Sequence, residues 1–278
     1  MVNSRLLIGF DSAWTAGNTG GLVGLLLQDD GHYTSFGPPI QVNFQDAEAI
    51  IHGWRAQYPS YQALVLVDQP LVVKNESGQR EVESIVGSSV SLRYGGMQPA
   101  NKRRMGMFDD EAPLWKFTEN FGNSLGVDSL NSSCCLIETY PVLILIALEL
   151  LRTDLRPKGR LPKYNPVRKT FQQDDWNYLC AKMAEYFDKP DGCEINTWLL
   201  NQIGKKPRKR DQDGLDACIC LVAAMHLARR KMCLQIGSAE SGEIVVPYLE
   251  TLDTELRERC TRIDKNPAEW VRVFRAAA

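Results

Sequence analysis

Short apolar runs separated by turn residues dominate the beginning of the chain. The run RLLIGF at 5–10 predicts a buried strand, and GLVGLLLQ at 21–28 predicts a second one. The turn Asp29-Asp30-Gly31 separates the second run from a third strand at 32–36. A tight turn between two such runs predicts that the second and third strands form an antiparallel hairpin.

The pattern then changes to helix and strand in alternation. Apolar positions at helical spacing predict a helix over 46–57, and ALVLV at 63–67 predicts a fourth strand. CCLI at 134–137 predicts a fifth. The order β-β-β-α-β and then β predicts an α/β fold, with a mixed five-stranded sheet whose first three strands are antiparallel and whose faces are flanked by helices. The first and fourth strands are expected side by side at its centre.

Two long segments interrupt this order. The polar, Gly-rich stretch 71–131 follows the fourth strand as a large insertion with one or two helices, and its position suits a lid. Segment 141–204 is expected to be mainly helical. The length of 278 residues, 44% of them hydrophobic, suits one core, so 1–278 is predicted to be a single domain with 71–131 inside it.

The last part of the chain is expected to begin with a buried helix. The stretch 215–228 is almost entirely apolar, which is typical of a buried helix. An edge strand is expected at 243–248, and the polar stretch 255–278 is expected to be helical at its end.

Composition narrows the classes of function. The formal net charge of −2 carries no global polyanion-binding signature, so any nucleic-acid contact must come from local clusters. The apolar stretch 142–151 is too short to span a membrane, and Glu149 interrupts it. Eight cysteines without a CxxC pair, and three histidines without zinc spacing, indicate reduced thiols and a cytoplasmic protein.

Acidic residues follow three of the predicted strands. Asp11 ends the first strand, Asp68 the fourth, and Glu138 the fifth. Because ligands of open α/β sheets bind beyond the carboxyl ends of the strands, these acids are expected to collect at one site. Aspartate is also common in turns and caps, which explains any one of them alone but explains three at equivalent places poorly.

The helix at 215–228 begins with further acids. Asp213 and Asp216 are three residues apart and therefore share a face, which the apolar positions below them direct towards the sheet. The helix macrodipole favours acids at this end whatever their purpose. That explanation suits Asp211 as a cap, suits Asp213 fairly well and suits the inward Asp216 least.

Carboxylates gathered within about 4–6 Å repel one another unless one is protonated or a cation lies between them. Mg²⁺ or Mn²⁺ with oxygen ligands resolves the conflict, and two such ions can promote phosphodiester hydrolysis. The predicted function is therefore a metal-dependent nuclease with a two-metal site. Its predicted metal ligands are Asp11, Asp68, Glu138, Asp213 and Asp216, and all of them except Glu138 are also predicted to be catalytic.

Five motifs in order, IGFDSAW, VLVDQPL, NESGQREVE, IETYP and DGLDACICLVAA, resemble the family called domain of unknown function 429. The resemblance covers about 7–230. It implies a ribonuclease H-like fold with an acidic metal site, in a family of predicted nucleases whose activity is itself inferred from the fold. The family's strand acids match Asp11 and Asp68, its helix acids match Asp213 and Asp216, and its glutamate before a Pro-containing turn matches Glu138.

A basic run lies directly before the acidic helix. Its cations are expected to contact a nucleic-acid backbone, DNA or RNA, although a solvated loop explains them equally well. They are Lys205, Lys206, Arg208, Lys209 and Arg210. Three aromatic residues are candidates for stacking on bases, namely Trp14, Tyr140 and Trp115, although aromatic residues at such places more often serve in packing.

Two other functions compete with the nuclease. The Gly-rich stretch DSAWTAGNTGG suits a nucleotide-binding phosphotransferase or ATPase, although the chain carries only one copy of this motif. A non-catalytic protein that binds nucleic acid or another protein is the third possibility. Carboxylates that are splayed or paired with Lys and Arg would favour it, whereas carboxylates around a common point would favour the nuclease.

Overall fold

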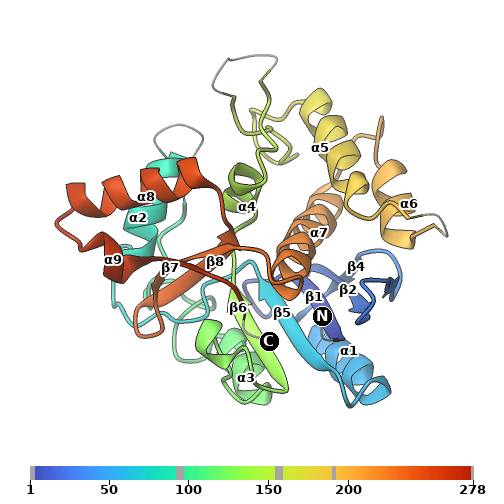
Figure 1. Ribbon diagram of the computed structural model, residues 1–278, viewed down its shortest axis with the longest axis horizontal. Helices are drawn as coiled ribbons and strands as arrows, with labels where there is room; N and C mark the ends of the chain where they lie inside the picture. The colour runs from blue at the N-terminus through green and yellow to red at the C-terminus, as the bar shows by residue number, and fades with distance from the viewer. Residues whose placement is uncertain (1–3, 92–96, 154–158, 190–191, 277–278) are drawn as a thin grey trace.

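The computed structural model describes residues 4–91, 97–153, 159–189 and 192–276. The larger of its two sheets is mixed and is built from the N-terminal half of the chain (Figure 1). Its strands are β1 (Arg5–Asp11), β2 (Gly20–Leu27), β3 (Tyr33–Ser35), β4 (Ile40–Val42), β5 (Gln62–Val67) and β6 (Cys134–Glu138). The predicted α/β class with a mixed sheet is confirmed.

The strand order is β3-β2-β1-β5-β6. β2 is antiparallel to both β1 and β3, whereas β1, β5 and β6 are mutually parallel neighbours. The predicted central pairing of the first and fourth strands is therefore confirmed by β1 and β5. In register, Phe10 lies opposite Val67, and Val67 lies opposite Glu138. The three acidic strand ends consequently lie at one edge of the sheet.

The predicted third strand at 32–36 is found as β3, and it is followed by a further short strand, β4, which the sequence pattern did not predict. β3 and β4 both pair with β2, so the larger sheet has six strands instead of five. The sequence Gly37-Pro38-Pro39 lies between them. Proline has no N–H to donate to a ladder and therefore interrupts the pairing. The two prolines end the pairing of β3 with β2, and pairing with β2 begins again at Ile40 in β4.

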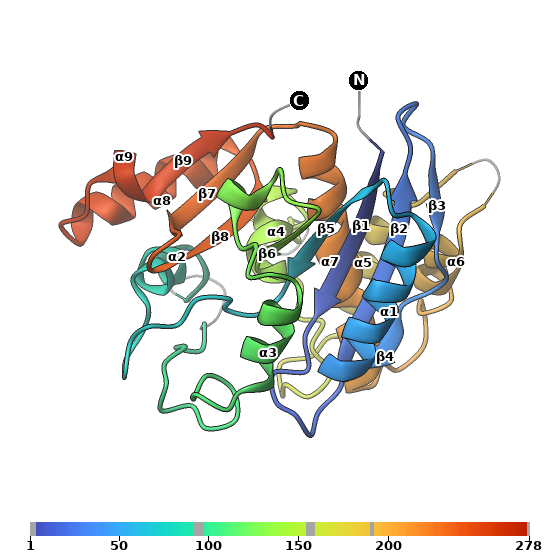
Figure 2. The same cartoon turned by 90° about the horizontal axis from the view of Figure 1, so that it is seen from below.

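Helices cover both faces of this sheet (Figure 2). On one face, Leu6, Ile8 and Phe10 share a core with α1 (Phe44–Gln57) and α3 (Pro113–Asn120). On the other, Leu7 shares a core with α7 (Lys209–Ala228). Because side chains alternate along a strand, Asp11 falls on the same face as Leu7 and meets α7.

Two glycines allow α7 to lie directly on the sheet. A Cβ at Gly9 would collide with the backbone oxygen of Ala217, and one at Gly21 would collide with that of Asp213. Any larger residue at either position would lift the first turns of α7 away from the strands. These glycines therefore set how closely the helix acids approach β1.

The remaining helices surround this arrangement. The predicted insertion contains α2 (Glu81–Ser91), α3 and the short 3₁₀ helix η1 (Val127–Ser129), and the segment before α7 contains α4 (Pro141–Ala147), α5 (Gln173–Glu185) and α6 (Glu194–Leu200). None of the helices in the described part of the chain has the length and apolar character needed to cross a membrane.

The end of the chain corrects the sequence prediction. Instead of one edge strand and a terminal helix, it forms a three-stranded antiparallel sheet in the order β8-β7-β9. The elements after α7 are β7 (Cys233–Ser238), β8 (Gly242–Pro247), α8 (Glu250–Arg262), α9 (Pro267–Trp270) and β9 (Val271–Phe274). The helix predicted at the end is replaced by β9, because pairing of VRVF with β7 outweighs the polar character of the segment. Residues 277–278 lie outside the described chain.

Candidate acidic site

A pocket of about 670 Å³ lies at the carboxyl ends of β1 and β5. Asp11 and Asp68 are held next to each other there, because the Asp68 amide donates to the Phe10 carbonyl at 2.8 Å and so extends the parallel pairing by one residue. Asp11 is 5% exposed, and Asp68 is half-buried. The sequence placed both acids at strand ends, and the sheet brings them together as predicted.

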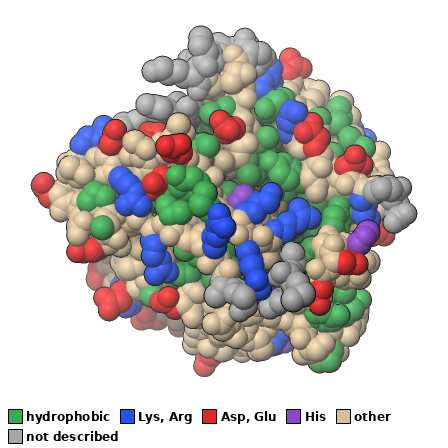
Figure 3. Space-filling model, in the orientation of Figure 1, with side chains coloured by type: hydrophobic (Ala, Val, Ile, Leu, Met, Phe, Trp, Pro, Cys, Tyr) green, Lys and Arg blue, Asp and Glu red, His purple; other side chains and the backbone are tan. Residues whose placement is uncertain are grey.

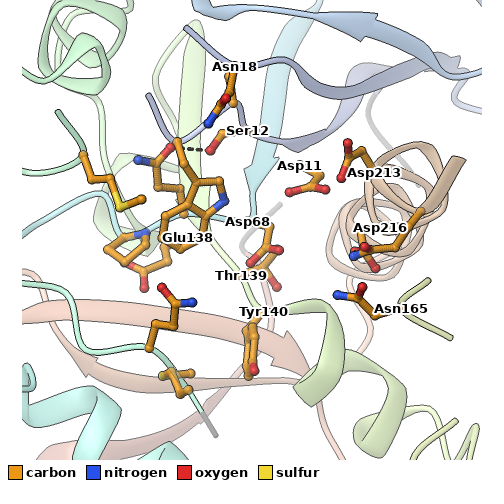
Figure 4. A pocket seen from close by; sticks show the side chains of 18 of the residues that line it. Asp11, Ser12, Asn18, Asp68, Glu138, Thr139, Tyr140, Asn165, Asp213 and Asp216 are labelled. Atoms are coloured by element: carbon orange, nitrogen blue, oxygen red, sulfur yellow. Dashed lines mark hydrogen bonds between the residues drawn. The ribbon is translucent and has the colours of Figure 1, made fainter. Parts of the chain in front are cut away.

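α7 supplies the opposite wall of the pocket. Asp213 and Asp216 both line it and are both buried. Figure 4 shows the side chains of these two residues and of Asp11 and Asp68 around a common space. Asp211 lies outside the pocket lining and accepts a hydrogen bond from the Arg208 amide at 2.8 Å, which is the capping role predicted for it. We refer to the four inward aspartates as the aspartate cluster.

The aspartate cluster is electrostatically crowded. Burial raises the pKa of Asp11 well above its usual range, and the charges of Asp68 and Asp216 raise it further. The pKa of Asp68 is likewise raised, first by burial and then by Asp216. Burial raises the pKa of Asp216 to about 6. Burial and neighbouring negative charge both disfavour the ionised state of a carboxyl group. The raised pKa values therefore indicate that the positive charge near the cluster is too small to stabilise all of its carboxylates in the ionised state.

Neutral donors moderate this crowding at Asp216. The Tyr164 hydroxyl donates to it at 2.7 Å, and the Gln212 side-chain amide donates to its other oxygen. The charge of Lys209 and then both hydrogen bonds favour the charged carboxylate and hold the pKa of Asp216 below the value that burial alone would impose. The two hydrogen bonds also orient Asp216 towards the space it shares with the other aspartates.

Lys209 is the cation closest to the cluster. Its ammonium group donates to Asp213, and about half of its side chain is exposed. Burial lowers the pKa of Lys209, but the charge of Asp11 and the hydrogen bond to Asp213 raise it by more. Among the described residues, Asp11, Asp68 and Asp216 have no Lys or Arg at ion-pair distance. One half-exposed lysine therefore faces four carboxylates.

Glu138 lines the same pocket but is paired differently. The Arg80 guanidinium donates to both of its oxygens, at 2.6 and 2.9 Å, and the Leu71 amide donates at 3.0 Å. The Arg80 side chain also binds Glu83 at 2.8 Å. We call Arg80, Glu83 and Glu138 the Arg80 cluster. Because the Arg80 guanidinium already faces both Glu138 oxygens, the charge of Glu138 is compensated within the fold, which sets it apart from the aspartates; its role as a metal ligand stays a prediction.

The predicted nucleic-acid contacts divide into two groups. Lys209 and Arg210 line the pocket, whereas Lys205, Lys206 and Arg208 are exposed outside its lining. Arg208 and Arg210 lie within 4 Å of Asp211. Arg168, which the sequence did not single out, is exposed at the pocket. The cations at the pocket itself are therefore Lys209, Arg210 and Arg168, together with the buried Arg80.

The other end of α7 is basic. Arg229 and Lys231 are exposed just beyond its C-terminus, and Arg230 lies near the start of β1, where its charge lowers the pKa of Arg5 after burial has done so. Figure 3 shows Lys and Arg side chains gathered in the middle of the face that Figure 1 presents. Acids at the start of α7 and cations at its end follow the helix macrodipole.

The chemistry of the aspartate cluster fits a hard divalent cation, since it supplies carboxylate oxygens and an excess of negative charge. Among the described residues, no group of three His, Cys, Asp or Glu side chains is placed to hold a metal ion by itself. Mg²⁺ commonly binds through one or two carboxylates, with water and substrate phosphates completing its shell. The cluster therefore suits a cation completed by substrate, not a closed protein cage.

Several pocket residues were missed by the sequence analysis. They have no motif signal of their own, because their roles depend on which neighbours the fold brings to them. They are Ser12, Gln69, Asn165, Arg168, Tyr164 and Gln212, of which Tyr164 contacts the site through Asp216. Ser12 and Gln69 directly follow the strand-terminal aspartates, and that position is the one signal that would have found them.

Comparisons of this chain with known protein families, with curated proteins and with solved structures found no match. The resemblance to domain of unknown function 429 therefore rests on the sequence motifs alone.

Proposed function

We propose that this chain is a metal-dependent nuclease with a ribonuclease H-like fold, and that it belongs to the family its motifs resemble. The strand order β3-β2-β1-β5-β6 supports the fold, because its first three strands are antiparallel and the next two continue in parallel, as that fold requires. The eight free, buried cysteines support a cytoplasmic location.

The observation that carries the proposal is the uncompensated aspartate cluster. Four acids from three separate elements surround one pocket, and within the described part of the chain a single half-exposed lysine pairs with them. A buried charge without a counter-charge is costly, so a fold that gathers four carboxylates with so little positive charge retains them at the expense of stability. Mg²⁺ or Mn²⁺ would be bound by carboxylates of Asp11, Asp68, Asp213 and Asp216, with one or two of them and substrate phosphate oxygens to each ion, and would supply charge stabilisation for phosphodiester hydrolysis.

The chain's own residues then have distinct tasks. Tyr164 and Gln212 hold Asp216 in place, and Lys209 balances Asp213. Arg168 and Arg210 at the pocket offer positive charge to a phosphate backbone. The walls formed by β1, β5 and α7 keep the carboxylates in a low-dielectric setting, where their electrostatic effect on a bound phosphate is strongest.

Substitution of the acids tests this proposal. Asp11→Asn and Asp216→Asn would be assayed with Mg²⁺ or Mn²⁺ on single-stranded, duplex, hybrid and branched substrates. We expect each to lower the cleavage rate by about a hundred-fold or more. Asp211→Asn is the matched control, because it lies on the same helix outside the pocket and asparagine can still cap. Unchanged cleavage by both pocket variants would rule out the assignment.

A non-catalytic binding protein is the second candidate, and one observation favours it. Asp213 and Glu138 are each paired with a cation, so the charge of two of the five predicted ligands is already compensated by side chains of the fold. Manganese soaked into crystals separates the two candidates, since the nuclease requires electron density for an ion on aspartate oxygens. The nucleotide-binding alternative stays a prediction, which titration with ATP and magnesium tests.

A further inference from the structure

The pocket continues past the aspartate cluster into a part with a different lining. Ser12, Trp14, Gln69 and Met107 line it, and we call it the side compartment. Figure 4 shows Ser12 on the side of Asp11 that faces away from Asp213 and Asp216. The side compartment is therefore continuous with the acidic site but carries an aromatic ring, a thioether and a neutral amide in place of carboxylates.

Gln69 presents an unused hydrogen-bond donor in this compartment. Its side-chain oxygen accepts from the Ser12 hydroxyl. Gln69 is 1% exposed, and its side-chain nitrogen has no hydrogen-bond partner among the described residues. A buried donor without a partner costs free energy, so its retention in a pocket wall points to an acceptor that a ligand supplies.

Trp14 provides the flat wall. It has a positive φ of 62°, and the Thr15 amide donates to the Ala13 carbonyl at 2.7 Å across it, which makes it the centre of a γ-turn. This turn is rare and strained for a bulky residue. Trp14 packs edge-to-face on the buried Phe108, with ring centroids 6.0 Å apart. The strained turn therefore holds the half-buried indole in the pocket wall against a fixed support.

We propose that the side compartment receives one unpaired nucleobase, which stacks on Trp14 and accepts a hydrogen bond from the side-chain nitrogen of Gln69. Every nucleobase offers both a π-face and at least one acceptor, so the aromatic wall and the single donor match it. A phosphate would match the donor but not the ring.

This inference rests on the proposed nuclease function and narrows its substrate class. Ser12 and Gln69 directly follow Asp11 and Asp68, so one nucleotide can place its base in the side compartment and its phosphate at the aspartates. A base paired inside a duplex cannot enter such a pocket unless it leaves the stack. The substrate class is therefore nucleic acid that is single-stranded, or locally unpaired, at the cleaved position.

Binding of two matched strands tests the inference. One is a labelled oligothymidine of about ten nucleotides, and the other has the same backbone with abasic sugars throughout. Fluorescence anisotropy would be measured without divalent metal, so that hydrolysis plays no part. We expect the wild-type chain to bind the base-bearing strand about ten-fold more tightly, since stacking on one aromatic residue contributes about 1–3 kcal/mol. Trp14→Leu and Gln69→Met should each reduce this preference.

The control variants separate stacking from folding. Trp14→Phe retains a ring and should keep most of the preference, and Trp270→Leu removes a half-buried tryptophan of α9 outside the pocket. Equal binding of both strands by wild type, or a preference that survives both Trp14→Leu and Gln69→Met, would overturn the inference. A chain that shows the preference but cleaves no strand contradicts only the nuclease proposal. A chain that cleaves but shows no preference contradicts only the side compartment.

Discussion

Two groups of buried acids line the same pocket and differ in the positive charge that faces them. In the Arg80 cluster, one buried guanidinium binds Glu83 and Glu138, and backbone amides of Leu71, Arg80 and Ala100 donate to the same carboxylates. In the aspartate cluster, four acids share one half-exposed lysine. The first cluster is satisfied within the fold, whereas the second lacks positive charge.

This difference separates structural acids from candidate functional ones. A buried carboxylate with a full set of donors can serve the fold, since breaking its pair is what costs stability. A buried carboxylate without them opposes the fold and is expected where a ligand completes it. Proximity to the pocket alone would have grouped Glu138 with the aspartates, and its partner Arg80 is what distinguishes it.

Removal of Arg80 should have the largest effect on stability. Arg80→Met leaves Glu83 and Glu138 buried without their cation, and we expect the free energy of unfolding to fall by about 3–5 kcal/mol. Urea unfolding at neutral pH measures the loss. Arg103→Met, at an exposed position of the same insertion, should change stability by no more than about 0.5 kcal/mol. Equal, small effects of both substitutions would contradict the contrast between the clusters.

Substitution of an acid in the aspartate cluster should raise the free energy of unfolding, whereas removal of Arg80 lowers it. Since burial raises the pKa of Asp216 to about 6, the folded state binds its proton more tightly than the unfolded state does. The stability that the bound proton contributes is fully present below the pKa of an aspartate in the unfolded chain, which is near 4. It is lost as pH rises through about 6, the pKa of Asp216 in the folded state. Asp216→Asn should therefore be more stable than wild type at pH 8, by up to about 3 kcal/mol.

The pH dependence of this difference is the test. Unfolding free energies of wild type and Asp216→Asn would be compared from about pH 4 to pH 8, with Asp211→Asn as control. The advantage of Asp216→Asn should shrink as pH falls towards 4. An asparagine variant that is less stable than wild type at pH 8 would show that Asp216 is compensated after all.

A divalent cation should supply the charge that the aspartate cluster lacks. Mg²⁺ or Mn²⁺ at about a hundred-fold excess over its Kd should stabilise the wild-type chain by about 2.7 kcal/mol, because it binds the folded state. Thermal unfolding with and without the metal measures this gain. Asp11→Asn should lose most of it, whereas Arg80→Met, if folded, should keep it. Equal gains in wild type and Asp11→Asn would place the metal elsewhere.

The smallest effect concerns the hydroxyl that holds Asp216. Tyr164→Phe removes a hydrogen bond to the charged carboxylate, at a cost of about 1–2 kcal/mol above the pKa of Asp216. Because the lost bond favours the ionised form, the pKa of Asp216 should rise further, and the loss of stability with rising pH should continue to a higher pH than in wild type. Nuclear magnetic resonance titration of the Asp216 carboxyl detects the shift. An unchanged midpoint would mean that solvent replaces the hydroxyl.

The sequence by itself determined the elements whose signals are local. The apolar runs of β1 and β5, their terminal aspartates and the helical pattern of α7 predicted both the central sheet and the position of the site. The places of Asp11 and Asp68 at the ends of apolar runs, and the spacing of Asp213 and Asp216 on α7, were enough to direct the acids to one space. These properties depend on residues a few positions apart, which a sequence displays directly.

Only the tertiary structure decided which acids are compensated. Arg80 and Glu138 are 58 positions apart, and nothing in either segment announces their pairing. The same holds for Tyr164 and Asp216, and for the pairing of β9 with β7 that replaced a predicted helix. Charge compensation and strand pairing depend on which surfaces pack together across long separations. The sequence therefore located the acidic site, whereas the fold determined which of its carboxylates remain available to a ligand.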